Sequence, residues 1–145
     1  MIIKKVPFAS ESYDEMKRFR EGILRLPLGL KLSVDDINGE DAQIHIAAIE
    51  DGGSIIGTVL LKPLSQDRVK LRQMAVSPSL QRRGIGRKLV DHAEESARAL
   101  GFTTVELHAR TYVQGFYEKL GYQIDGEPFI EVSLQTIKMI KRLAL

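Results

Sequence analysis

Apolar residues at spacings of three and four positions predict two amphipathic helices in the chain. The apolar positions of the first helix are Tyr13, Met16, Phe19 and Ile23. Those of the second helix are Ile85, Leu89, Ala93, Ala97 and Leu100. Ser10 or Ser12 can cap the first helix, and Gly101 is placed to end the second. Three basic side chains are expected on the outer surface of the first helix: Arg18, Arg20 and Arg25.

Short apolar or alternating runs predict the β-strands. These runs cover residues 2–6, 44–49, 55–61, 71–76, 103–109 and 129–143. Asp51-Gly52-Gly53 predicts a hairpin turn between the second and third strands. In the last run the alternation changes phase, which predicts a bulge near Gln135 or Thr136. A short helical stripe from Val113 to Leu120 precedes that run, and the whole pattern predicts an α/β fold.

Length and composition indicate a single globular domain over residues 1–145. The chain has 43% hydrophobic and 28% charged residues, which is typical of a protein with its own core. Its net charge of +2 does not indicate nucleic acid or a membrane as the partner. It has no cysteine, which excludes disulfides, thiolate metal sites and a cysteine nucleophile. The first ten residues lack the apolar core of a signal peptide, so a cytoplasmic location is expected.

The loop from Ser77 to Gly86, SPSLQRRGIG, has the chemistry of an anion site. Gly84 and Gly86 let backbone N–H groups converge on a ligand at the N-terminus of the second predicted helix. The charged side chains nearby are all basic, namely Arg82, Arg83, Arg87 and Lys88. A pyrophosphate would suit this loop. In the alternative interpretation Ser79 caps the helix, the glycines permit close packing and the arginines are solvated.

Two motifs decide between these interpretations. Gln81-Arg82-Arg83-Gly84-Ile85-Gly86 follows Met74-Ala75-Val76, and Phe116-Tyr117-Glu118-Lys119-Leu120-Gly121-Tyr122 comes further along the chain. The first resembles Q/R-x-x-G-x-G/A, the acyl-CoA pyrophosphate loop of the GNAT superfamily of N-acetyltransferases. The second is similar to the FYEKLGF signature of the same superfamily. Both motifs stand in the family's order and spacing, and the resemblance covers roughly residues 44–143.

The resemblance implies both a fold and an activity. The fold is a strongly twisted mixed sheet of about six or seven strands with helices on both faces. The activity is direct transfer of an acetyl group from acetyl-CoA, the cosubstrate, to a primary amine of a small molecule or protein, without a metal. The resemblance assigns to acetyl-CoA the residues Met74, Ala75, Val76, Gln81, Arg82, Arg83, Gly84, Ile85, Gly86, Arg87 and Phe116. It makes Tyr117 the general acid for the departing coenzyme A thiolate.

The same resemblance predicts how the sheet receives acetyl-CoA. In this family the strand at 71–76 and the strand at 103–109 part at their ends. The pantetheine arm then pairs with the first of them like an added strand. A backbone N–H near Val76 is placed to stabilise the tetrahedral oxyanion.

The general base stays unassigned at this stage. Some family members use a glutamate at the position that corresponds to Lys70, and a frequent asparagine before the second motif is Arg110 here. An arginine at that place could reach a phosphate instead. The remaining candidates for the base are Glu106, His108 and the acidic residues between 35 and 41. His45 is expected to be a core or edge histidine.

The acceptor side is open to two interpretations. In one, the apolar loop at residues 26–32 and the acids at 35–41 shape the acceptor pocket, as this region does in the family. In the other, the loop packs in the core and the acids are solvated. Two further functions also remain open: a degenerate GNAT domain that binds acyl-CoA as a sensor, and an RNA-binding domain that uses the basic loop. A homodimer is a further expectation from similar proteins.

Overall fold

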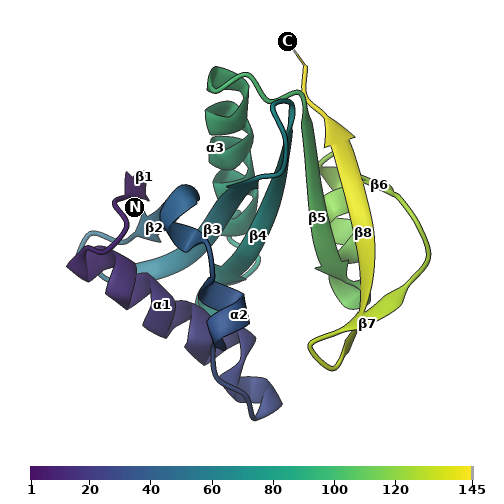
Figure 1. Cartoon of the computed structure of the whole chain (residues 1–145). Helices are drawn as coiled ribbons and strands as arrows, with labels where there is room; N and C mark the ends of the chain where they lie inside the picture. The colour runs from purple at the N-terminus through teal and green to yellow at the C-terminus, as the bar shows by residue number, and fades with distance from the viewer. Residues whose placement is uncertain (145) are drawn as a thin grey trace.

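The computed structural model describes residues 1–144 and is organised around one sheet (Figure 1). Within these residues the sheet has eight strands, in the order β1-β2-β3-β4-β5-β8-β6, with β7 paired to β8. The strands are β1 (Ile2–Val6), β2 (Ile44–Ile49), β3 (Ile55–Pro63), β4 (Arg68–Val76), β5 (Thr104–Arg110), β6 (Gln123–Ile124), β7 (Phe129–Glu131) and β8 (Leu134–Arg142). The α-helices are α1 (Glu11–Leu24), α2 (Val34–Ile37), α3 (Ile85–Ala99) and α4 (Gln114–Lys119). The mixed α/β fold expected from the sequence is confirmed.

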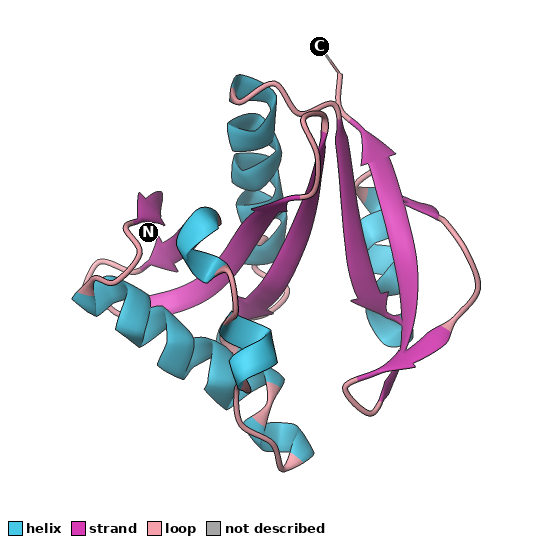
Figure 2. Cartoon of the chain, viewed as in Figure 1, coloured by secondary structure: helices cyan, strands magenta, loops and turns pink. Residues whose placement is uncertain are grey.

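Helices cover both faces of the sheet, as Figure 2 shows. α3 packs against β2, β3 and β4 on one face, and α1 packs against β3 and β4 on the other. Successive side chains of β2 point to opposite faces of the sheet and contribute to both cores. Ile46 belongs to the core under α3, and Ala47 belongs to the core under α1. Ser10 caps α1 by accepting a hydrogen bond from the Tyr13 N–H at 3.1 Å.

The sheet opens between its two central strands. β4 and β5 form a parallel pair only at Arg68–Leu71 and Thr104–Leu107. Beyond these positions the two strands separate into a V, which Figure 1 shows plainly. In the described part of the chain, the β5-facing edge of β4 therefore has no strand partner from Arg72 to Val76. This opening confirms the expected parting of the strands and leaves room for a ligand with an extended backbone-like arm.

A bulge bends β4 where the opening begins. Thr58 pairs with Ala75 and Leu60 pairs with Arg72, so two residues of β4 lie opposite one residue of β3. Gln73 takes a positive φ of 55° at this point. Thr58 Oγ1 fixes the bulge by donating a hydrogen bond to the Gln73 carbonyl at 3.0 Å. Bulges of this kind increase strand twist and re-aim the side chains beyond them.

The prediction of a bulge near Gln135 or Thr136 is wrong. The run 129–143 is split by a two-residue turn at Val132 and Ser133, both at positive φ, which joins β7 to β8 as a hairpin. Two consecutive residues with φ above zero match the twist of a tight β-hairpin. Neither is glycine or asparagine, which is why the sequence showed only a change of phase rather than a turn.

Candidate active site

Two adjoining cavities occupy the opening between β4 and β5. The larger has a volume of about 910 Å³ and the smaller about 400 Å³. They share a wall of five residues: Leu24, Met74, Arg110, Val113 and Tyr117. Because the two cavities meet at this wall, a group bound in one can reach a group bound in the other.

The larger cavity is lined by almost all residues that the resemblance assigned to acetyl-CoA. Its lining includes Met74, Ala75, Val76, Gln81, Arg82, Gly84, Ile85, Gly86, Arg87 and Phe116. Arg83 does not belong to this lining. The larger cavity thus combines the open edge of β4, the basic loop and the N-terminus of α3.

The loop before α3 offers this cavity an uncapped helix N-terminus as well as basic side chains. Gly84 is the N-cap of α3 at φ 80° and Arg82 also has a positive φ. No side chain caps the helix, so the interpretation in which Ser79 is the cap is wrong. A Cβ on Gly86 would lie 3.3 Å from the Phe116 ring, so this glycine lets α3 and α4 approach closely. The uncapped N–H groups and the basic side chains Arg82 and Arg87 suit a phosphate-bearing ligand.

Tyr117 stands at the junction of the two cavities. Its ring is 6% exposed and packs against Phe116 and Tyr122 at centroid distances of 4.9 and 5.7 Å. Among residues 1–144 the hydroxyl has no hydrogen-bond partner, although it is not fully enclosed. Burial raises the pKa of this hydroxyl well above its usual value. Tyr117 is therefore a protonated donor at neutral pH within the shared wall.

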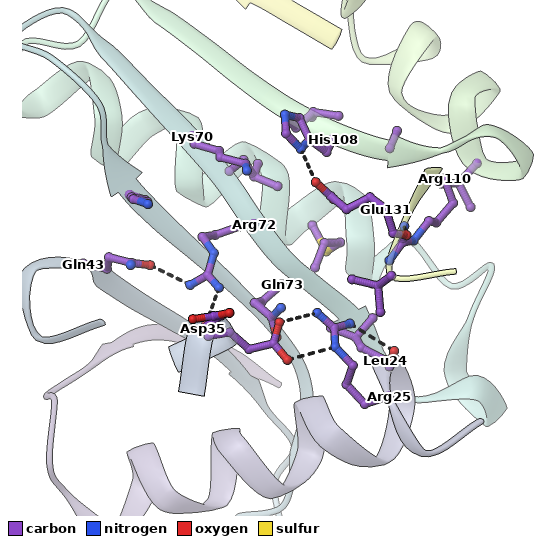
Figure 3. Close-up of a pocket in the computed structure, with 18 of the residues that line it drawn as sticks. Leu24, Arg25, Asp35, Gln43, Lys70, Arg72, Gln73, His108, Arg110 and Glu131 are labelled. Carbon is purple, nitrogen blue, oxygen red and sulfur yellow. Dashed lines mark hydrogen bonds and ion pairs between the residues drawn. The ribbon is translucent and has the colours of Figure 1, made fainter. Parts of the chain in front are cut away.

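The smaller cavity lies between the α1–α2 region and the strands β4 and β5 (Figure 3). The interpretation in which residues 26–32 pack in the core is wrong, because Leu26 is 52% and Leu30 39% exposed. Asp36 forms a bidentate pair with Arg25, at 2.9 and 3.1 Å, inside the cavity wall. Burial would raise the pKa of Asp36, but the hydrogen bonds from Arg25 and Ser33 outweigh it and lower that pKa.

A buried ion cluster supports this wall. Glu40 is 1% exposed and accepts hydrogen bonds from Arg20 at 2.9 and 2.6 Å, from Arg72 at 2.9 Å and from Tyr13 at 2.8 Å. Burial would raise the pKa of Glu40, but the bonds from Arg20 reverse the shift and lower it. The expectation of surface positions for Arg20 and Arg25 is wrong, since both are buried against acids.

His108 and Glu131 form a pair on the opposite wall. His108 Nδ1 lies 2.9 Å from Glu131 Oε2, and Figure 3 shows the two side chains pointing toward one another. The hydrogen bond from His108 lowers the pKa of Glu131. Because Nδ1–H donates to this carboxylate, a neutral His108 carries its lone pair on Nε2, which has no partner within residues 1–144. Glu131 thereby fixes the tautomer of a potential base.

Among the other candidates for a base, Glu106, Asp36 and Glu40 are held in ion pairs, whereas Asp35 lines the smaller cavity. Glu106 accepts a hydrogen bond from Arg68 at 3.0 Å, lies 3.8 Å from Lys138 and lines neither cavity. Glu106 and His108 share a sheet face but belong to separate ion pairs. His45 is 2% exposed and donates from Nε2 to the Glu40 carbonyl at 2.7 Å, which confirms it as a core histidine.

Residues 9–122 match the profile of the Acetyltransferase (GNAT) family. The chain belongs to this family. The N-acetyltransferase YitI of Bacillus subtilis, itself uncharacterised, is 28% identical over 124 residues, which cover 81% of this chain and 83% of YitI. YyaT of the same organism is 33% identical over 75 residues, 52% of this chain, and the match spans only about half, 51%, of YyaT.

Solved structures agree with the GNAT assignment. A Lactobacillus plantarum protein described as a candidate N-acetyltransferase is 25% identical, with a TM-score of 0.87 over 99% of this chain and 100% of its own. An aminoglycoside 6'-N-acetyltransferase in complex with coenzyme A has a TM-score of 0.77 at 20% identity, over 98% of this chain and 97% of its own. At that identity the second likeness concerns the fold alone.

One residue of the candidate site, Glu131, escaped sequence reasoning, and the contacts of another, Arg110, differ from the phosphate contact considered for it. Glu131 had no motif around it, and its place beside His108 depends on the unforeseen hairpin turn. Arg110 replaces the family's frequent asparagine, and it donates hydrogen bonds to the Glu131 carbonyl and, at 2.7 Å, to Thr136 Oγ1. This arginine therefore holds the hairpin against β5. Within residues 1–144 no cluster of three or more potential metal ligands occurs, and no described helix is long and apolar enough to cross a membrane.

Proposed function

We propose that this GNAT protein transfers the acetyl group of acetyl-CoA to a primary amine held in the smaller cavity. The observation that carries the proposal is the junction of the two cavities at Tyr117. The larger cavity offers an open strand edge and an uncapped helix N-terminus, and the smaller offers polar side chains. A thioester on one side and an amine on the other can then meet at the shared wall.

Three features of the larger cavity fit acetyl-CoA. The unpaired edge of β4 at Met74–Val76 suits the amide groups of the pantetheine arm. The loop around Gly84, with Arg82 and Arg87, suits the pyrophosphate. Phe116, which is 37% exposed, provides an apolar surface beside the arm. An aminoglycoside 6'-N-acetyltransferase of the same fold was solved in complex with coenzyme A, which supports acyl-CoA as the class of ligand.

Two side chains would move the protons of the reaction. The amine nitrogen bonds to the thioester carbonyl carbon as the carbon–sulfur bond breaks, so the amine loses a proton and the sulfur gains one. His108 Nε2 accepts the amine proton while Glu131 holds the ring in place. Tyr117 donates to the departing sulfur. Since its raised pKa makes full transfer uphill, its hydroxyl first acts as a hydrogen-bond donor to the developing thiolate charge.

The alternative of a degenerate, acyl-CoA-sensing domain has less support. The chain keeps Tyr117 at the junction and a histidine–carboxylate pair in the acceptor cavity. A sensor would need neither. The relatives named as N-acetyltransferases also favour the transferase. A homodimer stays a prediction.

The test of this proposal combines a binding measurement with one variant. Acetyl-CoA and coenzyme A, each at about 100 times its dissociation constant, should stabilise the protein by about 2.7 kcal/mol, whereas ATP should not. Tyr117→Phe should keep that stabilisation but lower kcat about a hundredfold. No thermal shift with acetyl-CoA would refute the cofactor assignment. Equal kcat in the two proteins would remove Tyr117 from the mechanism.

A further inference from the structure

The smaller cavity has more basic than acidic side chains in its lining. Five basic residues line it, Arg25, Lys62, Lys70, Arg72 and Arg110, against three acidic ones, Asp35, Asp36 and Glu131. Arg25 is paired with Asp36, and Arg72 with the buried Glu40 behind the wall. Glu131 is engaged by His108. Lys62, Lys70 and Arg110 have no ion-pair partner within 4.0 Å among residues 1–144, and the carboxylates of Asp35 and Glu131 offset only part of their positive charge.

Lys70 lies on the part of β4 that still pairs with β5, next to the point where the two strands separate. It projects from β4 into the cavity, opposite His108 on β5 (Figure 3). In the described part of the chain no carboxylate oxygen lies within 4.0 Å of its ammonium. Glu106, its neighbour in register on β5, is held instead by Arg68 and Lys138. Lys70 is thus a half-buried cation without an ion-pair partner.

The neighbouring charges make this arrangement unfavourable without a ligand. Lys62 lies directly opposite Lys70 in the β3–β4 register, and like charges in facing positions destabilise a sheet. Burial lowers the pKa of Lys70, the Glu131 carboxylate opposes that shift, and the charges of Arg72 and Lys62 add to it. An anionic group beside the ammonium would relieve both effects, because it favours the charged form.

We infer that the acceptor is an amine that also carries an anionic group, a carboxylate or a phosphate, which binds to Lys70. This inference rests on the proposed function and names its substrate class. With the anion at Lys70, the amine of such a molecule lies on the side of His108 and Tyr117. A polycationic acceptor does not suit a cavity with surplus positive charge.

The first experiment measures binding without turnover. In the presence of coenzyme A, calorimetry compares three acetylated amines: N-acetyl-β-alanine, N-acetyl-O-phosphoethanolamine and the neutral N-propylacetamide. At least one anionic compound should bind about tenfold or more tightly than the neutral one, and the better of the two identifies carboxylate or phosphate. Equal affinity of all three, or binding by none, would overturn the inference. Loss of coenzyme A binding itself would instead count against the proposed function.

The second experiment assigns the preference to Lys70. Lys70→Gln should abolish the anionic preference, and Lys70→Arg should restore it. Lys138→Gln is the matched control, since Lys138 lies on the same sheet face but outside both cavities and pairs with Asp125 at 3.4 Å. In transfer assays with β-alanine and propylamine, Lys70→Gln should raise KM for β-alanine more than it changes kcat. A preference that survives Lys70→Gln, or that Lys138→Gln also removes, would contradict the role of Lys70.

Discussion

The two cavities of this protein are lined by different kinds of groups. The larger one presents an open strand edge, a glycine loop with basic side chains and an aromatic ring. The smaller one is walled by charged side chains from Arg25, which follows α1, and from α2, β3, β4, β5 and the β7–β8 hairpin. A ligand common to a whole family can be recognised by backbone, whereas a ligand particular to one member needs side chains that can vary. The contrast predicts that relatives differ more in the lining of the smaller cavity than in that of the larger one.

The largest effect on stability is expected from the ion cluster behind the smaller cavity. Glu40→Gln would leave Arg20 and Arg72 without a counter-charge, and loss of one partner from a buried pair costs about 3–5 kcal/mol. Urea unfolding measures the change. The double variant Arg20→Met/Glu40→Gln should recover part of the loss, because one buried charge is gone. A cost below about 1 kcal/mol for Glu40→Gln would show that solvent already screens the cluster.

A smaller effect, confined to the larger cavity, is expected at the loop before α3. Gly84→Val places a β-branched residue at φ 80°, which costs about 1–3 kcal/mol unless the loop rearranges. The rearranged N–H groups should weaken coenzyme A binding about tenfold or more. Gly52→Ala, at a turn glycine without positive φ, is the control. Unchanged coenzyme A affinity in Gly84→Val would show that the backbone N–H groups of this loop do not contribute to binding.

The smallest effect is a pH dependence of the free energy of unfolding, which we expect from His45 beside the ion cluster of Glu40. Burial lowers the pKa of His45, so the unfolded chain binds more protons than the folded one in the window below about pH 6.5. The contribution of neutral His45 to the free energy of unfolding should therefore be fully present above that pH. Below it, the free energy of unfolding should fall as the pH decreases, by up to about 1.4 kcal/mol per pH unit.

Urea unfolding between about pH 5 and pH 7.5 tests this slope. His45→Gln should flatten it, because glutamine can still donate to the Glu40 carbonyl but does not titrate. His92→Gln, on α3, is the matched control. An equal slope in the wild type and in His45→Gln would assign the pH dependence to other groups.

The sequence predicted the larger cavity far better than the smaller one, for a physical reason. Residues 74–87 are contiguous, so strand, loop and helix form one local unit whose glycines and periodicity can be read directly. The smaller cavity joins residues far apart in the chain, such as Arg25 and Lys70. Arg20 illustrates the difficulty. Its place in the helical pattern indicated solvent, and only the fold brings Glu40 against it.

The same distinction explains the errors in the fold. The helices and the β2–β3 hairpin followed from apolar spacing and from glycine. The β7–β8 turn did not, because Val132 and Ser133 adopt positive φ under the constraint of strand pairing and of Arg110, which bonds the Glu131 carbonyl. Tertiary contacts there override local preference, and local preference is all that a single sequence displays.

Because β4 and β5 are paired at one end only, a small change in the angle between them displaces their separated ends. Pairing between the two strands is confined, within residues 1–144, to Arg68–Leu71 and Thr104–Leu107. Beyond this pivot β4 continues to Val76, an arm of about 16 Å at about 3.3 Å per residue. A rotation of about 5° would move its tip by about 1.4 Å, and a misplacement of about 1 Å can slow a reaction about a hundredfold. Val69 and Val105 are fully buried at the pivot. Their packing therefore influences the alignment of the reacting groups near the tip of β4.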